Sequence, residues 1–165
     1  MLLPIFMSGK AQGSLRQCFW LPMSHHIPLD GLAGAPTVQG SLWQLRSMLN
    51  KATGRSAFLN YAFYGCFCGY DGKGQPLDDT DRCCWAHDCC YEKLEGKCES
   101  KLQHYSFTYD TGIITCNDSE FCKSESCICD KALAYCLKEH TSSFNSSYKH
   151  FPGSQCSEKN LPCPA

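Results

Sequence analysis

One short stretch of the sequence combines residue types that are suited to hydrolysis. Residues 68–94 read CGYDGKGQPLDDTDRCCWAHDCCYEKL, in which three glycines precede an acidic cluster and a His-Asp step lies between two Cys-Cys pairs. Near neutral pH a histidine can take a proton from water. An aspartate beside a glycine loop can bind a hard cation whose other ligands are backbone carbonyls. The stretch therefore predicts a general base, His87, next to a calcium ligand, Asp88.

The histidine also needs a partner that orients its ring. His87 and the aspartate that follows it diverge by about 100° around a helix, so they cannot pair with each other. Asp130 is the candidate, because a disulfide between its neighbour Cys129 and Cys90 would bring two helices together. Tyr91, one turn after His87, could donate a hydrogen bond to that carboxylate. A lone helical histidine is more often a packing residue, but this combination is far more specific.

Cysteine is the most informative part of the composition. The chain has 15 cysteines in 165 residues, a density typical of disulfide scaffolds made in an oxidising compartment. Zinc sites usually contain C-x2-C pairs, whereas the spacings here are C-C and C-x-C. Cys18 stands apart from the others, and without it 14 remain, which is enough for seven bridges.

The first 40 residues differ in character from the rest. The apolar run MLLPIFM is short, contains Pro4 and lacks a preceding basic region, so it makes a poor signal peptide. The cysteines nevertheless predict a secreted, extracellular protein, and an alternative or mispredicted first exon is the preferred interpretation. We therefore expect an atypical leader or linker over residues 1–40 and a folded domain over residues 41–165. No apolar run approaches the ~20 residues of a membrane span.

Periodicity and turn signals predict the elements that position the site. An apolar stripe predicts an amphipathic helix that Gly54 ends, and its members are Leu42, Leu45, Met48 and Leu49. A second helix, over residues 78–94, begins with capping carboxylates, and a third spans residues 120–139. Residues 104–116 alternate β-forming side chains around Asp-Thr-Gly and predict a hairpin.

Three segments, in order, resemble the signatures of secreted phospholipase A2. They are YGCFCG at residues 64–69, DRCCWAHDCCY at residues 81–91 and CICDKALAYC at residues 127–136. The resemblance covers residues 41–163 and is nearest to group II, and within it to group IIC. It implies a mainly α, disulfide-rich fold: two long antiparallel helices cross-linked by disulfides, an N-terminal helix, a calcium-binding loop and a small β-hairpin.

The resemblance implies calcium-dependent hydrolysis of the sn-2 ester of glycerophospholipids. The products would be a lysophospholipid and a free fatty acid such as arachidonic acid. His87 would activate the attacking water, and Asp130 would orient His87 while accepting hydrogen bonds from Tyr91 and Tyr105. Calcium would bind the phosphate and polarise the ester carbonyl.

The calcium ligands implied by the family are the Asp88 carboxylate and three backbone carbonyls, those of Phe67, Gly69 and Asp71. The N–H of Gly69 would help to hold the oxyanion. Lys101 would contact the substrate phosphate, although an exposed, solvated lysine is an equal alternative. The family usually has glycine where this chain has Asp71. If that position requires a positive φ, aspartate costs about 1 kcal/mol there, although its carbonyl is retained.

The family pattern also implies seven disulfides that exclude Cys18. They are Cys66–Cys156, Cys68–Cys84, Cys83–Cys136, Cys89–Cys163, Cys90–Cys129, Cys98–Cys122 and Cys116–Cys127. This pairing supports a mature start at Ser41, where the first helix would line a channel for acyl chains. The proposed contacts with substrate are Leu42, Leu45 and Leu49, although core packing would produce the same stripe.

The charge balance indicates which partner the protein meets. A net charge of −1 gives no strong attraction to nucleic acid or to an acidic membrane. From residue 41 onward, 13 Lys and Arg stand against 15 Asp and Glu, a net charge of −2. We expect a monomer that binds neutral phospholipid membranes or micelles peripherally, with Trp43 and Tyr70 near the lipid-facing rim.

Two other functions stay open. A catalytically weak or inactive homologue could act as a receptor ligand or a membrane-binding ligand, and Asp71 in the calcium loop favours that alternative. A disulfide scaffold without any site is the third, but it leaves the ordered set of His87, Asp88 and Asp130 unexplained.

Overall fold

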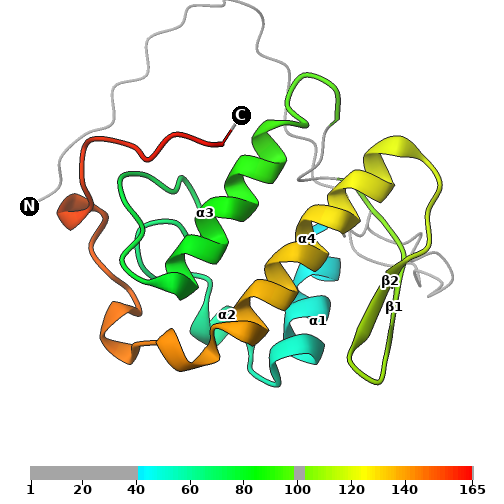
Figure 1. Ribbon diagram of the computed structural model, residues 1–165, viewed down its shortest axis with the longest axis horizontal. Coiled ribbons are helices and arrows are strands. Elements are labelled where there is room, and N and C mark those ends of the chain that lie inside the picture. The colour runs from blue at the N-terminus through cyan, green and yellow to red at the C-terminus, as the bar shows by residue number, and fades with distance from the viewer. Residues whose placement is uncertain (1–40, 99–102, 165) are drawn as a thin grey trace, which may run out of the picture. The chain divides into compact units, whose positions relative to one another are not determined.

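The computed structural model describes residues 41–98 and 103–164. Cys18 and Lys101 lie outside these residues, and the predicted division of the chain at residue 40 stays a prediction. The described part is helix-rich, with two long helices, a two-stranded hairpin and seven disulfides (Figure 1). The predicted fold class is therefore confirmed.

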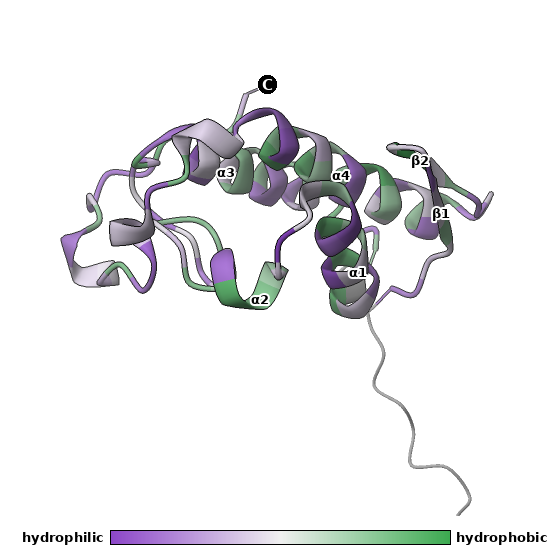
Figure 2. Cartoon of the chain, turned by 90° about the horizontal axis from the view of Figure 1, so that it is seen from below, coloured by the Kyte–Doolittle hydropathy of each residue, from purple (hydrophilic) through white to green (hydrophobic). Residues whose placement is uncertain are grey.

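Three helices form the framework, and their bounds agree with the predicted ones to within two residues. They are α1 (Ser41–Thr53), α3 (Asp79–Glu92) and α4 (Phe121–Glu139). The long helices α3 and α4 lie side by side and run antiparallel, and α1 packs against α4 (Figure 1). Figure 2 shows α1 and the short helix α2 (Ala57–Asn60) on the same side of this pair.

Local interactions set the helix ends. Asp78 caps α3, because its side-chain oxygen accepts the N–H of Asp81 at 2.8 Å. Gly54, which follows α1, has a φ of +67°, a left-handed conformation that glycine adopts without steric cost.

The predicted hairpin is present and is attached to α4. Strand β1 (Phe107–Asp110) pairs antiparallel with β2 (Ile113–Cys116) along its whole length. The two turn residues, 111 and 112, have φ angles of +45° and +89°, as two-residue hairpin turns require. The Tyr135 hydroxyl accepts the N–H of Ile114 at 2.7 Å, which fixes the hairpin against the helix.

Several short helical turns were not predicted. Besides α2, the segment after α4 contains three 3₁₀ turns, at Thr141–Ser143, Ser146–Tyr148 and Gly153–Gln155. Each of these elements is a single turn, too short to produce a hydrophobic repeat in the sequence.

The core is a mixture of apolar side chains and disulfides. Its most deeply buried large members come from α1, the loop after α2, β2 and α4, and are Met48, Tyr64, Ile114 and Leu137. All seven disulfides pair as the family pattern implies. Among the described helices, not one combines the length and hydrophobicity that a membrane crossing needs.

Candidate active site

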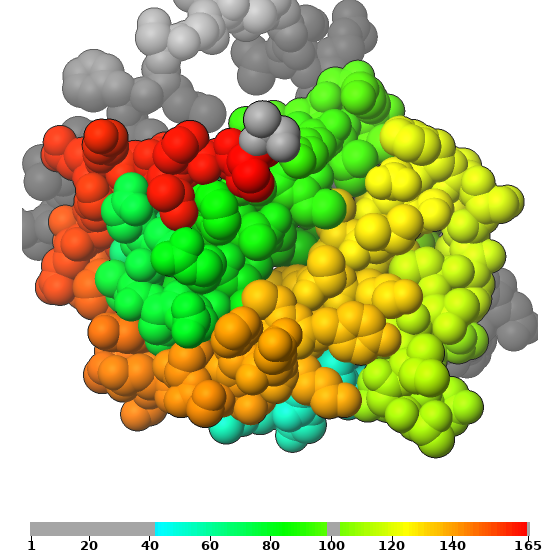
Figure 3. All heavy atoms as spheres, viewed as in Figure 1, coloured from blue at the N-terminus to red at the C-terminus, as the bar shows by residue number. Residues whose placement is uncertain are grey.

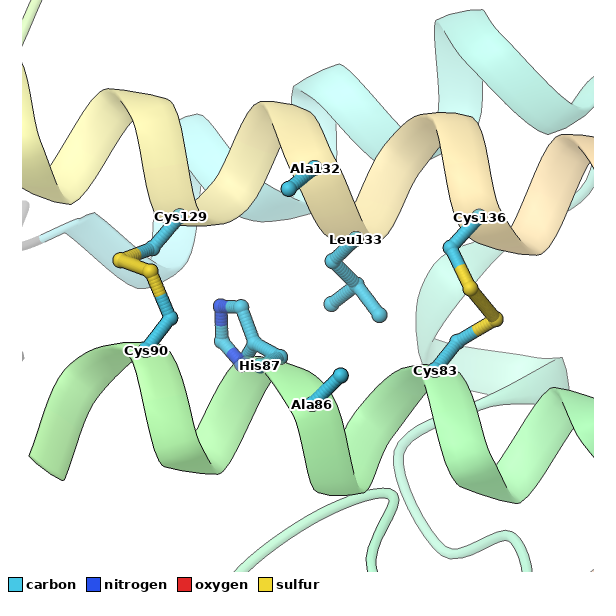
Figure 4. Close-up of a pocket in the computed structure, with 8 residues that line it drawn as sticks. All are labelled: Cys83, Ala86, His87, Cys90, Cys129, Ala132, Leu133 and Cys136. Atoms are coloured by element: carbon cyan, nitrogen blue, oxygen red, sulfur yellow. A yellow bond between two sulfur atoms is a disulfide. The ribbon is translucent and has the colours of Figure 1, made fainter. Parts of the chain in front are cut away.

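The predicted pair of His87 and Asp130 forms between the two long helices. The Nε2 atom of His87 lies 2.7 Å from Oδ1 of Asp130, and the exposed fractions of the two side chains are 14% and 0%. Figure 4 shows His87 pointing from α3 toward α4, beside the Cys90–Cys129 disulfide that was expected to bring the helices together.

The hydrogen bond to Asp130 fixes which ring nitrogen of His87 carries the proton. A carboxylate can only accept, so Nε2 of the neutral ring carries the proton. Nδ1 then keeps its lone pair, and it has no partner within the part of the chain that the structure describes. This is the tautomer that a general base needs.

Two tyrosines complete the surroundings of the buried carboxylate. Tyr91 donates its hydroxyl to Oδ1 of Asp130 at 2.8 Å, and Tyr105 donates to Oδ2 at 2.5 Å. The Tyr91 ring also lies against His87, with 4.6 Å between the ring centroids. These bonds compensate for the removal of the Asp130 carboxylate from water.

The glycine loop lies directly against Asp88. A Cβ atom at Gly72 would lie 2.7 Å from Oδ2 of Asp88 and 2.8 Å from the Phe67 ring, so only glycine permits this approach. Gly69 has a φ of +134°, and a Cβ there would meet the carbonyl oxygen of Ala62 at 2.4 Å. A carboxylate beside a loop of backbone carbonyls is the set of hard oxygen donors that suits calcium.

The chain is similar in sequence to known proteins of one family. A family model described as Phospholipase A2 matches residues 42–149. The chain belongs to the phospholipase A2 family. It is 49% identical over 123 residues to phospholipase A2 group V from Homo sapiens, covering 74% of this chain and 89% of that protein.

Other relatives in the phospholipase A2 family are similarly close. Basic phospholipase A2 B from Gloydius halys is 46% identical over 126 residues, covering 76% of this chain and 91% of that protein. Acidic phospholipase A2 PLA-1 from Eristicophis macmahoni is 47% identical over 118 residues, covering 72% of this chain and 97% of that protein. Assignment of this phospholipase A2 homologue to group II, or to group IIC within it, stays a prediction.

Asp71 occupies a strained position in the phospholipase A2 loop. Its φ is +53°, in the left-handed region, and its side chain is exposed. This position therefore has the positive φ on which the expected cost of aspartate depends, a backbone conformation that favours glycine. Aspartate tolerates it better than most residues, at a cost of about 1 kcal/mol.

Asp81 supports the backbone of the glycine loop, a role that sequence reasoning missed. It is fully buried, and its carboxylate accepts the backbone N–H groups of Cys66 and Phe67 at 2.8 Å each and of Leu77 at 2.9 Å. A Cβ at Gly65 would lie 2.4 Å from this carboxylate. Asp81 therefore holds both ends of the loop. The only signal was the DDTD run itself, which contains more carboxylates than one helix cap uses.

The predicted substrate contacts on α1 run from the surface into the core. The exposed fraction is 68% for Leu42 and 5% for Leu49, whereas Leu45 is half-buried. The position of Leu49 agrees with the core-packing interpretation, and a contact of this stripe with acyl chains stays a prediction. Trp43 and Tyr70 are exposed, as a lipid-facing rim would require.

A small apolar pocket lies beside His87 between α3 and α4. Its volume is about 220 Å³, and two disulfides, Cys83–Cys136 and Cys90–Cys129, bound it together with Ala86, Ala132 and Leu133 (Figure 4). Its lining comes from the two long helices alone and includes neither Asp88 nor the glycine loop.

Two clusters of possible metal ligands contain cysteines. They are Cys83, Cys136 and His140, and Cys89, Glu92 and Cys163. Neither can hold a metal through its cysteines, because those sulfurs are in disulfides.

Replacing Tyr105 by phenylalanine should reduce the free energy of unfolding at pH 7 by about 1–3 kcal/mol, because Oδ2 of buried Asp130 loses a donor. Burial raises the pKa of Tyr105, as does the charge of Asp130. The stabilisation that this hydroxyl gives the folded state is therefore fully present below the ordinary tyrosine pKa, about 10. It is lost progressively as pH rises above that value. Guanidinium unfolding should be measured for wild type and Tyr105→Phe at pH 7 and pH 10.5. The difference between their free energies of unfolding should be smaller at pH 10.5.

The matched control for this change is Tyr109→Phe on β1. Tyr109 is half-buried against the core, but its hydroxyl has no bond to Asp130. A Tyr105→Phe protein as stable as wild type at pH 7 would contradict the role given to this hydroxyl.

Proposed function

We propose that the protein hydrolyses the sn-2 ester of glycerophospholipids in a calcium-dependent reaction, giving a free fatty acid and a lysophospholipid. Membership of the phospholipase A2 family supports phospholipid hydrolysis in general. The observation that carries the finer proposal is the position of His87, whose Nε2 is bonded to buried Asp130 while Nδ1 keeps its lone pair.

In the proposed reaction, Nδ1 of His87 takes a proton from the attacking water as its oxygen approaches the ester carbon. The imidazolium that forms is stabilised by its hydrogen bond to Asp130, which does not itself take the proton. Tyr91 and Tyr105 keep that carboxylate in place. When the tetrahedral intermediate collapses, the imidazolium returns its proton to the departing alkoxide.

The proposed cation site uses the Asp88 carboxylate and the carbonyls of Phe67, Gly69 and Asp71. Bound calcium would supply positive charge for the substrate phosphate and for the developing oxyanion. The N–H of Gly69 is the protein's own candidate donor to that oxyanion.

The proposed partner is the surface of a neutral phospholipid membrane or micelle, bound by a secreted monomer. Exposed apolar side chains at the start of α1, in α2 and in the following loop support this proposal; they are Leu42, Trp43, Phe58, Leu59, Phe63 and Tyr70. α1 and α2 lie on the same side of the long helices (Figure 2), so their side chains could meet one lipid surface. The domain's slight negative charge agrees with a neutral rather than an anionic surface.

The test is hydrolysis of phosphatidylcholine in mixed micelles, with the label on the sn-2 acyl chain. We expect calcium-dependent release of labelled fatty acid that EGTA abolishes. Release of label in EGTA would contradict calcium dependence, and retention of label on the lysophospholipid would contradict sn-2 cleavage.

A second candidate is a catalytically weak or inactive ligand of a receptor or membrane, and the positive φ of Asp71 favours it. Calorimetric titration separates the two functions, because the enzyme must bind calcium at millimolar concentration whereas the inactive ligand need not.

Substitutions of Asp71 should change the calcium affinity according to how easily the new residue adopts a positive φ. Asp71→Gly and Asp71→Ala remove the same charge, but only glycine adopts a positive φ without cost. We expect the calcium Kd of Asp71→Gly to be about fivefold lower than that of Asp71→Ala, which corresponds to about 1 kcal/mol. Calorimetry on both variants measures the ratio. Equal affinities would show that this backbone position does not limit calcium binding.

A further inference from the structure

The segment Ser157–Cys163, near the C-terminus, lies along the end of the glycine loop. Gly74 is bonded to it through both of its backbone groups. Its N–H donates to Oδ1 of Asn160 at 2.8 Å, and its carbonyl oxygen accepts the N–H of Leu161 at 2.7 Å. In Figure 3 this part of the chain, in red, lies alongside the green atoms of the loop and α3.

The contact is close enough to require glycine in the loop. Gly74 is buried with a φ of +89°, and a Cβ there would lie 2.5 Å from the carbonyl oxygen of Ser157 and 2.9 Å from its nitrogen. The side-chain amide of Gln75 extends the contact by donating to the carbonyl of Lys159 at 3.1 Å.

Covalent and polar anchors hold this segment near both of its ends. The Cys66–Cys156 disulfide joins the residue before the segment to the start of the loop, and Cys89–Cys163 joins its last residue to α3, one residue after Asp88. Between these bridges the indole N–H of Trp85 donates to the carbonyl of Leu161 at 3.1 Å. The segment Ser157–Cys163 thus connects the glycine loop with α3, the helix that carries Asp88.

We propose that Ser157–Cys163 is a brace that holds the loop in its cation-binding conformation, and that Asn160 is a positioning residue of the site. This inference rests on the proposed calcium-dependent function. Asp81 fixes the loop from inside at residues 66, 67 and 77, and the brace fixes Gly74 from outside. The carbonyls at residues 67, 69 and 71 lie between these attachments. A loop that is already ordered loses less conformational entropy when it binds a cation.

The experiment compares Asn160→Ala with Asn160→Asp in the full chain with its disulfides intact. Alanine removes the acceptor of the Gly74 N–H, whereas aspartate retains an oxygen in its place. We expect Asn160→Ala to raise the calcium Kd about three- to tenfold and Asn160→Asp to bind no more weakly than wild type. The melting temperature in EGTA should change little, because Asn160 is exposed and the bridges remain.

Amide hydrogen exchange in EGTA supplies a readout without the cation. Asn160→Ala should speed exchange of the hydrogen-bonded loop amides of Cys68 and Lys73 about tenfold, while the amides of β1 and β2 keep the wild-type rate. Glu158→Ala, an exposed change in the same segment, serves as control and should leave both calcium affinity and exchange unaltered.

The outcomes distinguish failure of the brace from failure of the proposed function. If wild type binds calcium and Asn160→Ala binds it equally well, the brace is wrong while the function stands. Unchanged exchange in the loop of Asn160→Ala overturns the brace whatever the calcium result. If wild type binds no calcium, the proposed function fails and the positioning role of Asn160 fails with it.

Discussion

Replacing His87 by glutamine should lower kcat/KM for phospholipid hydrolysis by about 10²- to 10⁴-fold, the range expected when a general base is removed. Glutamine can still donate an amide N–H toward Asp130, so the buried carboxylate keeps a partner where His87 Nε2 lies 2.7 Å away. It cannot accept a proton from water at neutral pH. The loss of activity should therefore come from the missing proton acceptor, and the fold should stay intact.

The measurement is the initial rate on mixed micelles in saturating calcium, together with the calcium Kd and the melting temperature. We expect the Kd to stay within about twofold of wild type, because the general base is not one of the proposed ligands. His104→Gln is the matched control, since His104 is exposed and bonded to Gln44 rather than to Asp130. Wild-type turnover by His87→Gln would exclude this residue as the base.

Asp88→Lys should abolish calcium binding and with it hydrolysis. The change places an ammonium group where a carboxylate oxygen lies against Gly72 of the loop. The site then loses its one charged ligand and gains a charge that repels the cation. We expect the calcium Kd to rise by more than about 100-fold, which corresponds to a loss of more than about 2.7 kcal/mol of binding free energy.

Calorimetry and thermal unfolding with and without calcium measure this effect independently of catalysis. Calcium should raise the melting temperature of wild type but not that of Asp88→Lys. Asp79→Lys provides the control, because it makes the same change of charge at an exposed position on α3. Calcium-induced stabilisation of Asp88→Lys equal to that of wild type would place the cation elsewhere.

The helices and the hairpin could be predicted because each leaves a signal in the sequence, either a hydrophobic repeat or a cap or turn at its end. The stripe of α1, the Asp78 cap of α3 and the Asp-Thr-Gly turn of the hairpin all correspond to structure. The contact of His87 with Asp130 could be anticipated because the Cys90–Cys129 bridge limits how α3 and α4 can pack.

The loop supports could not be predicted in the same way, because they depend on single bonds between distant residues. Asp81 binds backbone N–H groups 14 and 15 residues earlier, and Asn160 binds one 86 residues earlier. Such bonds impose no periodicity on the sequence. Leu49 illustrates a different limit, since an apolar stripe looks the same whether it packs in a core or contacts lipid.

The connectivity of the seven bridges has a consequence for proteolysis. Any single peptide bond broken between Cys66 and Cys163 leaves two fragments that at least one bridge still joins. A nick between Cys98 and Cys116, in the long connection between α3 and α4, is spanned by five bridges, among them Cys90–Cys129. A protease could thus cut this domain once without separating its parts, and the fragments would part on a gel only after reduction.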